Sequence, residues 1–377
     1  MRGHHDQLGG CYKAGLERSI MTEKTQKQWV FVGGYGTTIE TFSFDPTTGA
    51  LVSVAVTEGV AESPTFLALD AKRQVLFAIS EKAGADAPEP GRASSFRVDA
   101  ATGKLTKLSE VWSGGGNTVS VVPSRSGKTL LTASSSTAEG RVAVIPVSES
   151  GELAEPSDSQ IAGKNAHGLV QSIDGQFVWV ACRGDENVAQ YRFDEAAGKL
   201  TLLPGPSVPV QRPSGPRRMA VHPTLGVAYV ILDWSGEIVS YRFGADGQLG
   251  SPATVSIFPK GKAPTSKAGA MTAAELEVSA DGKTVYASTR TAECQSIAIL
   301  KVDATTGRLT LVANEEARGL IKGPRHFMLS RDNRHLLVAN QDNDTLLAFQ
   351  VSPADGSLTL LGAATPTRVK KPNALAF

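Results

Sequence analysis

Hydrophobic and polar residues alternate in short runs along most of the chain, and a turn follows each run at nearly regular intervals. The run Val239-Ser240-Tyr241-Arg242-Phe243 has the period of two that is typical of a half-buried β-strand. After each run comes one phrase: an acidic or polar residue, a few small residues, Gly, any residue and Leu. The phrase predicts a hairpin turn with glycine in the left-handed conformation. It occurs seven times, at Asp45–Leu51, Asp99–Leu105, Glu149–Leu153, Asp194–Leu200, Ala245–Leu249, Asp303–Leu309 and Pro353–Leu358.

The spacing of these phrases predicts the architecture. Their final leucines are 54, 48, 47, 49, 60 and 49 residues apart, a period typical of propeller blades rather than of helical repeats. Upstream of each phrase lies a second repeated unit, a pair of apolar strands around a turn, as in Ala273–Arg290 and Pro324–Gln341. Two hairpins per repeat give the four strands of one blade. We therefore predict an all-β fold, a seven-bladed β-propeller; a β-sandwich array does not explain the equal spacing.

The two ends of the repeat region complement each other. Lys371–Phe377 resembles a first strand without its partner, and Trp29–Tyr35 resembles a second strand without its first. Pairing them would complete the seventh blade and close the ring through the N- and C-terminal strands, which leaves no open sheet edge. We expect one propeller domain over residues 29–377. Residues 1–28 are polar, without the apolar core of a signal peptide, and we expect a disordered leader or extension there.

Composition narrows the classes of partner. The 38 Lys and Arg residues nearly balance the 37 Asp and Glu residues, which disfavours a nucleic-acid-binding chain. Runs of 18 apolar residues are missing from the sequence, so we expect no membrane partner. The three cysteines, an odd and small number, fit a reducing compartment, and we expect a cytoplasmic protein that is a monomer or weak homo-oligomer.

Aligning the repeats by their turns places two rings of residues at one end of the central channel. Unlike the apolar strand interiors, these rings hold arginines, a histidine and carboxylates, so the channel mouth is the expected site. The first ring contains Thr65, Thr118, His167, Arg217, Ala274, Arg325 and Asn373, and the second contains Glu81, Ser134, Arg183, Asp233, Arg290, Gln341 and Tyr35.

Three long irregular segments fall between strands that connect at this same end. They are Glu81–Arg92, Gly205–Pro216 and Phe258–Thr272. Long loops on one face of a rigid scaffold often carry binding residues. The lysines of Phe258–Thr272, which are Lys260, Lys262 and Lys267, could form a cationic lid over an anionic substrate, or the segment could be an ordinary surface loop.

The sequence resembles the propeller lactonase family, which contains bacterial-type 6-phosphogluconolactonases and the fungal carboxy-cis,cis-muconate lactonizing enzyme. The resemblance covers nearly all of residues 29–377. It depends on three groups of residues: Gly323-Pro324-Arg325-His326 with Val338-Ala339-Asn340-Gln341-Asp342, Ala274-Glu275-Leu276 with Ser288-Thr289-Arg290, and Gly215-Pro216-Arg217 before His222-Pro223. It implies hydrolysis of a sugar-derived lactone, favours 6-phosphogluconolactone, and suggests a place in the pentose phosphate pathway.

The family pattern implies a catalytic set of His167, Arg217, Asp233 and Arg290. Three positions depart from the family pattern. Asp233 stands where the family more often has Glu, Asn165 replaces a His, and Arg218 follows Gly215-Pro216-Arg217 where the final His of Gly-Pro-Arg-His would be expected. For the remaining rim positions, we expect substrate-binding roles for Arg325, His326, Glu275, Arg183, Glu81 and Gln341.

The same residues suit lactone chemistry on general grounds. Opening a lactone requires a base that activates water, here Asp233 or His167, and cations that stabilise the oxyanion, here Arg217 and Arg290. The alternative for Arg217 and Asp233 is a plain rim ion pair between neighbouring strands. We expect a small anionic lactone as the partner, no cofactor and no metal. A muconate cycloisomerase and a non-catalytic binding propeller are the competing hypotheses.

Overall fold

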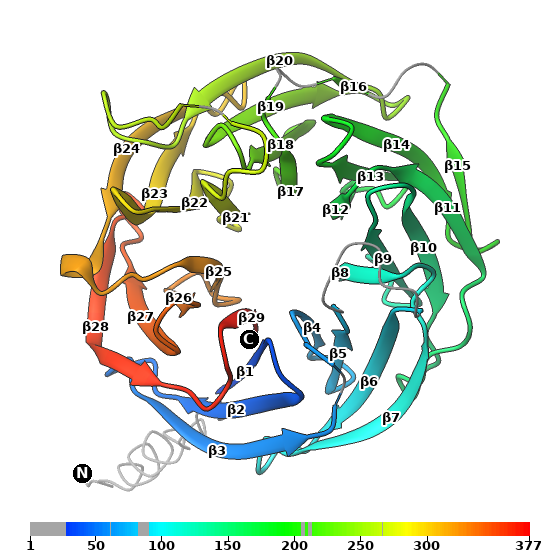
Figure 1. Cartoon of the computed structure of the whole chain (residues 1–377), viewed down its shortest axis with the longest axis horizontal. Helices are drawn as coiled ribbons and strands as arrows, with labels where there is room; N and C mark the ends of the chain where they lie inside the picture. The colour runs from blue at the N-terminus through cyan, green and yellow to red at the C-terminus, as the bar shows by residue number, and fades with distance from the viewer. Residues whose placement is uncertain (1–27, 61, 82–89, 205–207, 210–212, 266) are drawn as a thin grey trace, which may run out of the picture.

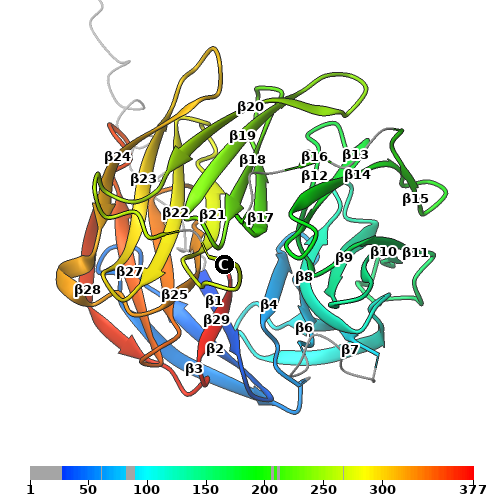
Figure 2. The same cartoon turned by 45° about the horizontal axis from the view of Figure 1, so that its top comes forward.

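The computed structural model describes residues 28–60, 62–81, 90–204, 208–209, 213–265 and 267–377. Seven antiparallel sheets stand around a central channel like the blades of a propeller (Figure 1). The tilted view in Figure 2 shows the sheets side by side with their strands running roughly along the channel. This arrangement confirms the predicted seven-bladed β-propeller.

Each sheet takes four consecutive strands of the repeat, with the first strand innermost. The first three complete blades are β4 (Phe66–Asp70), β5 (Val75–Ile79), β6 (Arg92–Val98) and β7 (Leu105–Trp112); β8 (Asn117–Pro123), β9 (Thr129–Ser135), β10 (Gly140–Pro146) and β11 (Asp158–Gly163); and β12 (Ala166–Gln171), β13 (Phe177–Cys182), β14 (Asn187–Asp194) and β15 (Lys199–Leu202), with the short β16 (Val208–Pro209) beside β14.

Three further complete blades follow along the chain. They are β17 (Pro216–Val221), β18 (Val227–Leu232), β19 (Glu237–Phe243) and β20 (Leu249–Ser256); β21 (Ala273–Val278), β22 (Thr284–Thr291), β23 (Cys294–Val302) and β24 (Leu309–Glu315); and β25 (Pro324–Leu329), β26 (His335–Asn340), β27 (Thr345–Val351) and β28 (Leu358–Pro366). A short 3-10 helix, η1 (Ala317–Gly319), connects the last two of these blades.

The seventh blade joins the two ends of the chain. Its strand order is β29 (Pro372–Ala376), β1 (Gln28–Gly34), β2 (Thr38–Phe44) and β3 (Leu51–Glu58). β1 pairs antiparallel with β29, and Phe31 lies opposite Ala376. The predicted ring closure is therefore confirmed, with β1 starting at Gln28. The leader was expected over residues 1–28; Gln28 instead begins β1, and residues 1–27 lie outside the described residues.

The repeated turn glycine has two physical reasons to be glycine. All seven, from Gly49 to Gly356, have φ between 61° and 90°, the left-handed region that was predicted. Each also lies against the preceding blade. A Cβ on Gly247 would stand 2.2 Å from the Phe177 ring, and one on Gly307 would stand 2.6 Å from Val227. A side chain at these turns would push neighbouring blades apart.

Aromatic side chains bind several of these turns to the preceding blade. Trp179 donates its indole N–H to the carbonyl of Gly247 at 2.9 Å, and Tyr229 donates its hydroxyl to that of Gly307 at 2.9 Å. Both rings are fully buried in hydrophobic clusters between adjacent blades. Each blade therefore packs its faces against its neighbours, and the ring holds the channel mouth in a fixed geometry. Among the described helices, none is long and apolar enough to cross a membrane.

Candidate active site at the channel mouth

The innermost strands begin with β-bulges at one end of the channel. At a bulge an extra residue is left out of the ladder and its side chain is re-aimed. The skipped residues include His167, Arg217 and Arg325, which the alignment had placed in one ring. In β8 the skipped residue is Val119, one position beyond the predicted Thr118. The register shifts in six blades: at Gly33/Gly34 of β1 against β29, Thr118/Ser120, Ala166/Leu169, Pro216/Arg218, Ala273/Leu276 and Pro324/His326.

A repeated hydrogen bond holds the second ring beside the first. Asp233 donates its backbone N–H to the carbonyl of Gly215, two residues before Arg217. Glu81, Arg183, Arg290 and Gln341 make the equivalent bond in their own blades, each to the residue two positions before its ring partner. Because the bond recurs in five blades, the same position of these blades lies at the same end of the channel.

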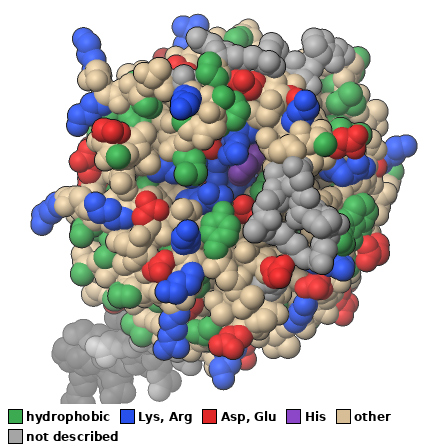
Figure 3. Space-filling model, viewed as in Figure 1, with side chains coloured by type: hydrophobic (Ala, Val, Ile, Leu, Met, Phe, Trp, Pro, Cys, Tyr) green, Lys and Arg blue, Asp and Glu red, His purple; other side chains and the backbone are tan. Residues whose placement is uncertain are grey.

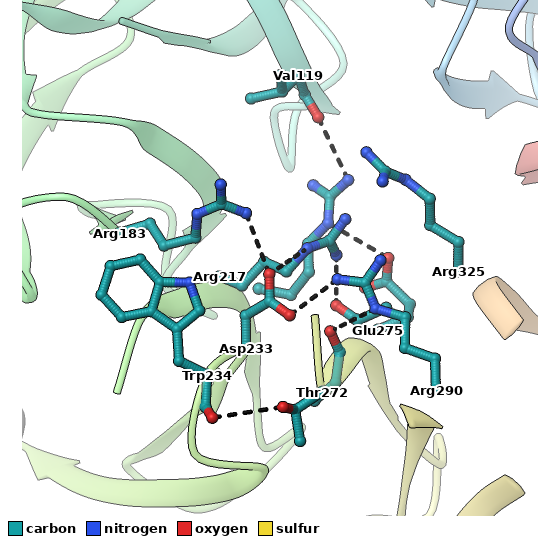
Figure 4. A network of polar contacts seen from close by, with 12 residues as sticks. Val119, Arg183, Arg217, Asp233, Trp234, Thr272, Glu275, Arg290 and Arg325 are labelled. Atoms are coloured by element: carbon teal, nitrogen blue, oxygen red, sulfur yellow. Dashed lines mark hydrogen bonds and ion pairs between the residues drawn. The ribbon is translucent and has the colours of Figure 1, made fainter. Parts of the chain in front are cut away.

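Three arginines converge on one carboxylate, and we call this group the arginine cluster: Arg183, Arg217, Asp233 and Arg290 (Figure 4). Asp233 is fully buried; its Oδ1 accepts from Arg290 Nη2 at 2.8 Å and its Oδ2 from Arg183 Nη1 at 3.1 Å. Arg217 Nε lies 3.7 Å from Oδ2, and its Nη1 donates to the carbonyl of Ala274. Because three blades contribute cations to Asp233, this is more than the rim ion pair between two neighbouring strands that was the alternative.

The arginine cluster has more positive than negative charge. Burial and the nearby guanidiniums of Arg290 and Arg325 lower the pKa of Arg217 well below its ordinary value, and Asp233 offsets this only in part. Figure 3 shows Lys and Arg side chains and a histidine gathered at the centre of the face seen in Figure 1. Such a mouth attracts a small anion, and bidentate arginine contacts suit phosphate or carboxylate groups.

His167 lies beside the cluster as a neutral imidazole. Only 6% of its surface is exposed, and its Nδ1 has no hydrogen-bond partner among the described residues. Burial and the charges of Arg217, Arg218, Arg183 and Arg325 hold its pKa well below its ordinary value of 6.5. At neutral pH the imidazole is therefore unprotonated, which is the form that a general base requires.

A second group lies at the rim, formed by Tyr35, Glu81 and Arg325. The Tyr35 hydroxyl donates to Glu81 Oε1 at 3.3 Å, and Arg325 Nη2 lies 3.8 Å from the same oxygen. The Arg325 guanidinium is 5.6 Å from the centre of the Tyr35 ring. With 17% of its side chain exposed, Arg325 remains accessible from the channel mouth.

Glu275 and His326, which were expected to bind substrate, lie one level deeper. Both are buried, and Glu275 Oε2 is 3.3 Å from Arg218 Nε and 3.7 Å from His326 Nε2. They line the lower channel, a cavity of about 500 Å³ that extends toward the opposite face. Glu275 is therefore the counter-ion of Arg218.

Gln341 lies in a recess beside the rim group, and only one of the three long loops is largely described. Gln341 and Tyr35 line a recess together with Asp342 and Lys370. The lysines of Phe258–Thr272 are exposed, and the lid hypothesis for them stays a prediction. The other two long loops lie largely outside the described residues. In the part of the chain that the structure describes, no three His, Cys, Asp or Glu side chains are grouped so that they could hold a metal ion.

Sequence reasoning missed the part that Arg218 plays, and it placed Tyr35 in the second ring without giving it a role in substrate binding. Arg218 had been noted only as a departure from a motif, yet its guanidinium reaches across the channel to Ser120 on β8. The one available signal was a second arginine directly after Arg217 on a strand that faces the channel.

Comparison with known proteins gives the same architecture. The family model described as "Lactonase, 7-bladed beta-propeller" matches residues 27–377. A 6-phosphogluconolactonase from Formosa agariphila is 25% identical over 349 residues, 88% of this chain and 95% of that protein. One from Bacillus subtilis is 25% identical over 314 residues, 79% of this chain and 83% of that protein.

Among solved structures, the periplasmic gluconolactonase of Pseudomonas aeruginosa is similar to this chain. It superposes with a TM-score of 0.81 at 27% identity, covering 92% of this chain and 98% of that one.

Proposed function

Because the chain belongs to the seven-bladed β-propeller lactonases, a family of lactone-hydrolysing enzymes, we propose that it converts 6-phosphogluconolactone to 6-phosphogluconate. The observation that carries this choice is the arginine cluster. Three guanidiniums and one carboxylate leave a surplus of two positive charges beside a neutral histidine. A phosphate monoester is close to a dianion at neutral pH and would balance that surplus.

The accessible arginines are suited to the phosphate. The side chain of Arg183 is 31% exposed and that of Arg325 is 17% exposed, whereas Arg217 and Arg290 are almost fully buried. We assign the phosphate to Arg183 and Arg325 near the solvent, and the lactone carbonyl to Arg290 and Arg217 below it. A buried guanidinium stabilises an oxyanion more than an exposed one, because water screens it less.

His167 is the proposed general base. Both oxygens of Asp233 already contact arginines, so taking a proton would break the ion pairs that hold the cluster together. The imidazole of His167 removes a proton from water as the water oxygen attacks the carbonyl carbon. The tetrahedral oxyanion then collapses, the ring C–O bond breaks, and the imidazolium returns the proton to the leaving oxygen. The carboxylic acid that forms releases its proton to solvent. Asp233 thus aligns Arg183 and Arg290.

The test is a coupled assay with 6-phosphogluconolactone, corrected for spontaneous hydrolysis. We expect acceleration by the wild type, weaker turnover of gluconolactone without phosphate, and a loss of about 100-fold or more in Arg290→Met. Arg192→Met is the matched control, because Arg192 is an exposed arginine that stacks on the Phe177 ring 4.9 Å away. No acceleration over buffer would overturn the proposal.

Parallel measurements address the two competing hypotheses. The same preparation is assayed by ultraviolet absorbance with 3-carboxy-cis,cis-muconate, whose carboxylates the arginines could also bind. Turnover of that compound alone would assign the chain to cycloisomerisation, and turnover of neither would favour a binding propeller.

The cytoplasmic location and the monomeric or weakly oligomeric state stay predictions. The buried thiols of Cys182 and Cys294 are free, which fits the predicted reducing compartment, whereas the Pseudomonas aeruginosa relative is periplasmic.

A further inference from the structure

A layer of side chains from five blades closes the channel beneath the arginine cluster. We call it the floor layer, and its members are Phe66, Ser120, Arg218, Glu275 and His326. The four polar members are each between 1% and 6% exposed. All five also line the top of the lower channel. The floor layer therefore separates the candidate site from the rest of the channel.

Arg218 is the residue that connects this layer. It begins on β17, and its Nη1 donates to Ser120 Oγ at 2.9 Å on the other side of the channel. Its guanidinium carbon lies 3.9 Å from the centre of the Phe66 ring, and its Nε lies 3.3 Å from Glu275. One side chain thus contacts three other blades.

The stem of Arg218 packs directly against the backbone beside His167. A Cβ on Gly168 would lie 2.7 Å from the Arg218 Cα and 3.1 Å from its Cδ. Glycine at this position allows the close approach, so the bulge that carries His167 lies on the Arg218 stem. Arg217, the preceding residue, is directed to Asp233 instead.

We propose that Arg218 is a positioning residue of the lactonase site: it closes the site from below and holds the His167–Gly168 bulge in place under the substrate. This inference rests on the proposed function. Arg218 also fixes a positive charge near the imidazole, where burial, Arg217, Arg218, Arg183 and Arg325 together keep the pKa of His167 low.

The Arg218 guanidinium is already engaged by Glu275, Ser120 and the Val119 carbonyl, so it acts through His167 rather than on the substrate. This separates its role from that of the arginines in the cluster above it. Its loss should therefore change kcat and leave KM nearly the same.

The experiment compares Arg218→Met with the double variant Arg218→Met/Glu275→Gln. The double variant removes both charges of the buried pair, because leaving Glu275 unpaired could prevent folding. Arg192→Met again removes one arginine that stacks on a phenylalanine, here on the third strand of its blade and in neither the arginine cluster nor the floor layer. Histidine Cε1 resonances are followed by NMR against pH, and His167→Gln assigns the His167 signal.

We expect a folded Arg218→Met variant to raise the titration midpoint of His167 by about one pH unit, and the double variant, which also loses the negative charge of Glu275, to raise it less. We also expect the loss of Arg218 to lower kcat about 10-fold or more with KM changed less than about twofold, since small misplacement of a catalytic group is costly. Arg192→Met should change neither quantity. An unchanged His167 midpoint in both Arg218 variants, or a wild-type kcat in the folded double variant, would overturn the proposal. The NMR measurement needs no substrate, so an inactive wild type would count against the proposed function, whereas an unshifted midpoint would count against the role of Arg218.

Discussion

Glu277 lies in the lower channel, below the floor layer, and we expect it to make the stability of the propeller depend on pH. It is on β21 two residues after Glu275, and its carboxylate accepts one hydrogen bond, at 2.7 Å from the Leu329 N–H. Burial raises the pKa of Glu277 from 4.5 to about 8, and the charge of Glu275 adds to the shift. At neutral pH the folded protein therefore keeps a proton on Glu277 that the unfolded chain releases.

This difference sets both the sign and the size of the effect. Because the folded-state pKa is raised, the contribution of Glu277 to stability is fully present below pH 4.5 and is lost as the pH rises through 8. Between pH 5 and pH 7 we expect the linkage to remove about 2–3 kcal/mol from the free energy of unfolding. Glu277→Gln resembles the protonated side chain and cannot ionise. The variant should therefore gain about 2–3 kcal/mol of unfolding free energy relative to the wild type as the pH rises from 5 to 7.

The measurement is urea unfolding followed by tryptophan fluorescence, for wild type and Glu277→Gln at both pH values. The packing cost of glutamine is nearly the same at both values and cancels in the comparison. Glu149→Gln removes an exposed carboxyl group and is the matched control. If the stability difference between Glu277→Gln and wild type is equal at pH 5 and pH 7, the reasoning about the buried proton is wrong.

Three further predictions concern the site and the ring. Asp233→Asn leaves the buried arginines without their carboxylate and should cost about 3–5 kcal/mol of unfolding free energy, measured by urea titration; an unchanged midpoint would contradict the network. Because the pKa of His167 lies well below 6.5, its base form persists as the pH falls, so the acid limb of kcat/KM should lie below pH 6.5; a limb centred higher would exclude it as the base. Tyr229→Phe removes the hydrogen bond to Gly307 and should cost about 1 kcal/mol in the same unfolding assay with activity retained, whereas equal stability would show that this bond contributes nothing.

The architecture could be predicted because short sequence patterns that determine turns and strands repeat along the chain. The phrase ending in Gly-x-Leu marks a turn with positive φ, and glycine is the residue that such a turn favours. Seven copies at similar spacing then determine the number of blades, and the complementary ends determine how the ring closes. Each of these signals depends on a few neighbouring residues, which a single sequence contains in full.

The depth of the site residues could not be predicted in the same way. Register counting placed Arg325 in the first ring and its neighbour His326 beside it as a substrate-binding residue. The bulge at Pro324/His326 instead leaves Arg325 at the rim, while His326 contacts Glu275 in the floor layer. A bulge changes which side of the strand a residue faces, and it depends on packing between blades that no alternation pattern records.

The role of Asp233, whose side chain is one methylene shorter than that of glutamate, became clear only from the tertiary structure. An aspartate where the family more often has glutamate raised the question of whether it could reach a substrate. In the structure the long arginine side chains reach the aspartate, since Arg183 and Arg290 approach from the blades on either side and Arg217 from its own blade. A carboxylate held from three directions is well placed to align cations and poorly placed to accept a proton. We therefore expect His167, rather than the shorter carboxylate of Asp233, to act as the base. The pH profile tests the role of His167, and the stability of Asp233→Asn tests the ion pairs of Asp233. The two measurements thus check the same arrangement independently.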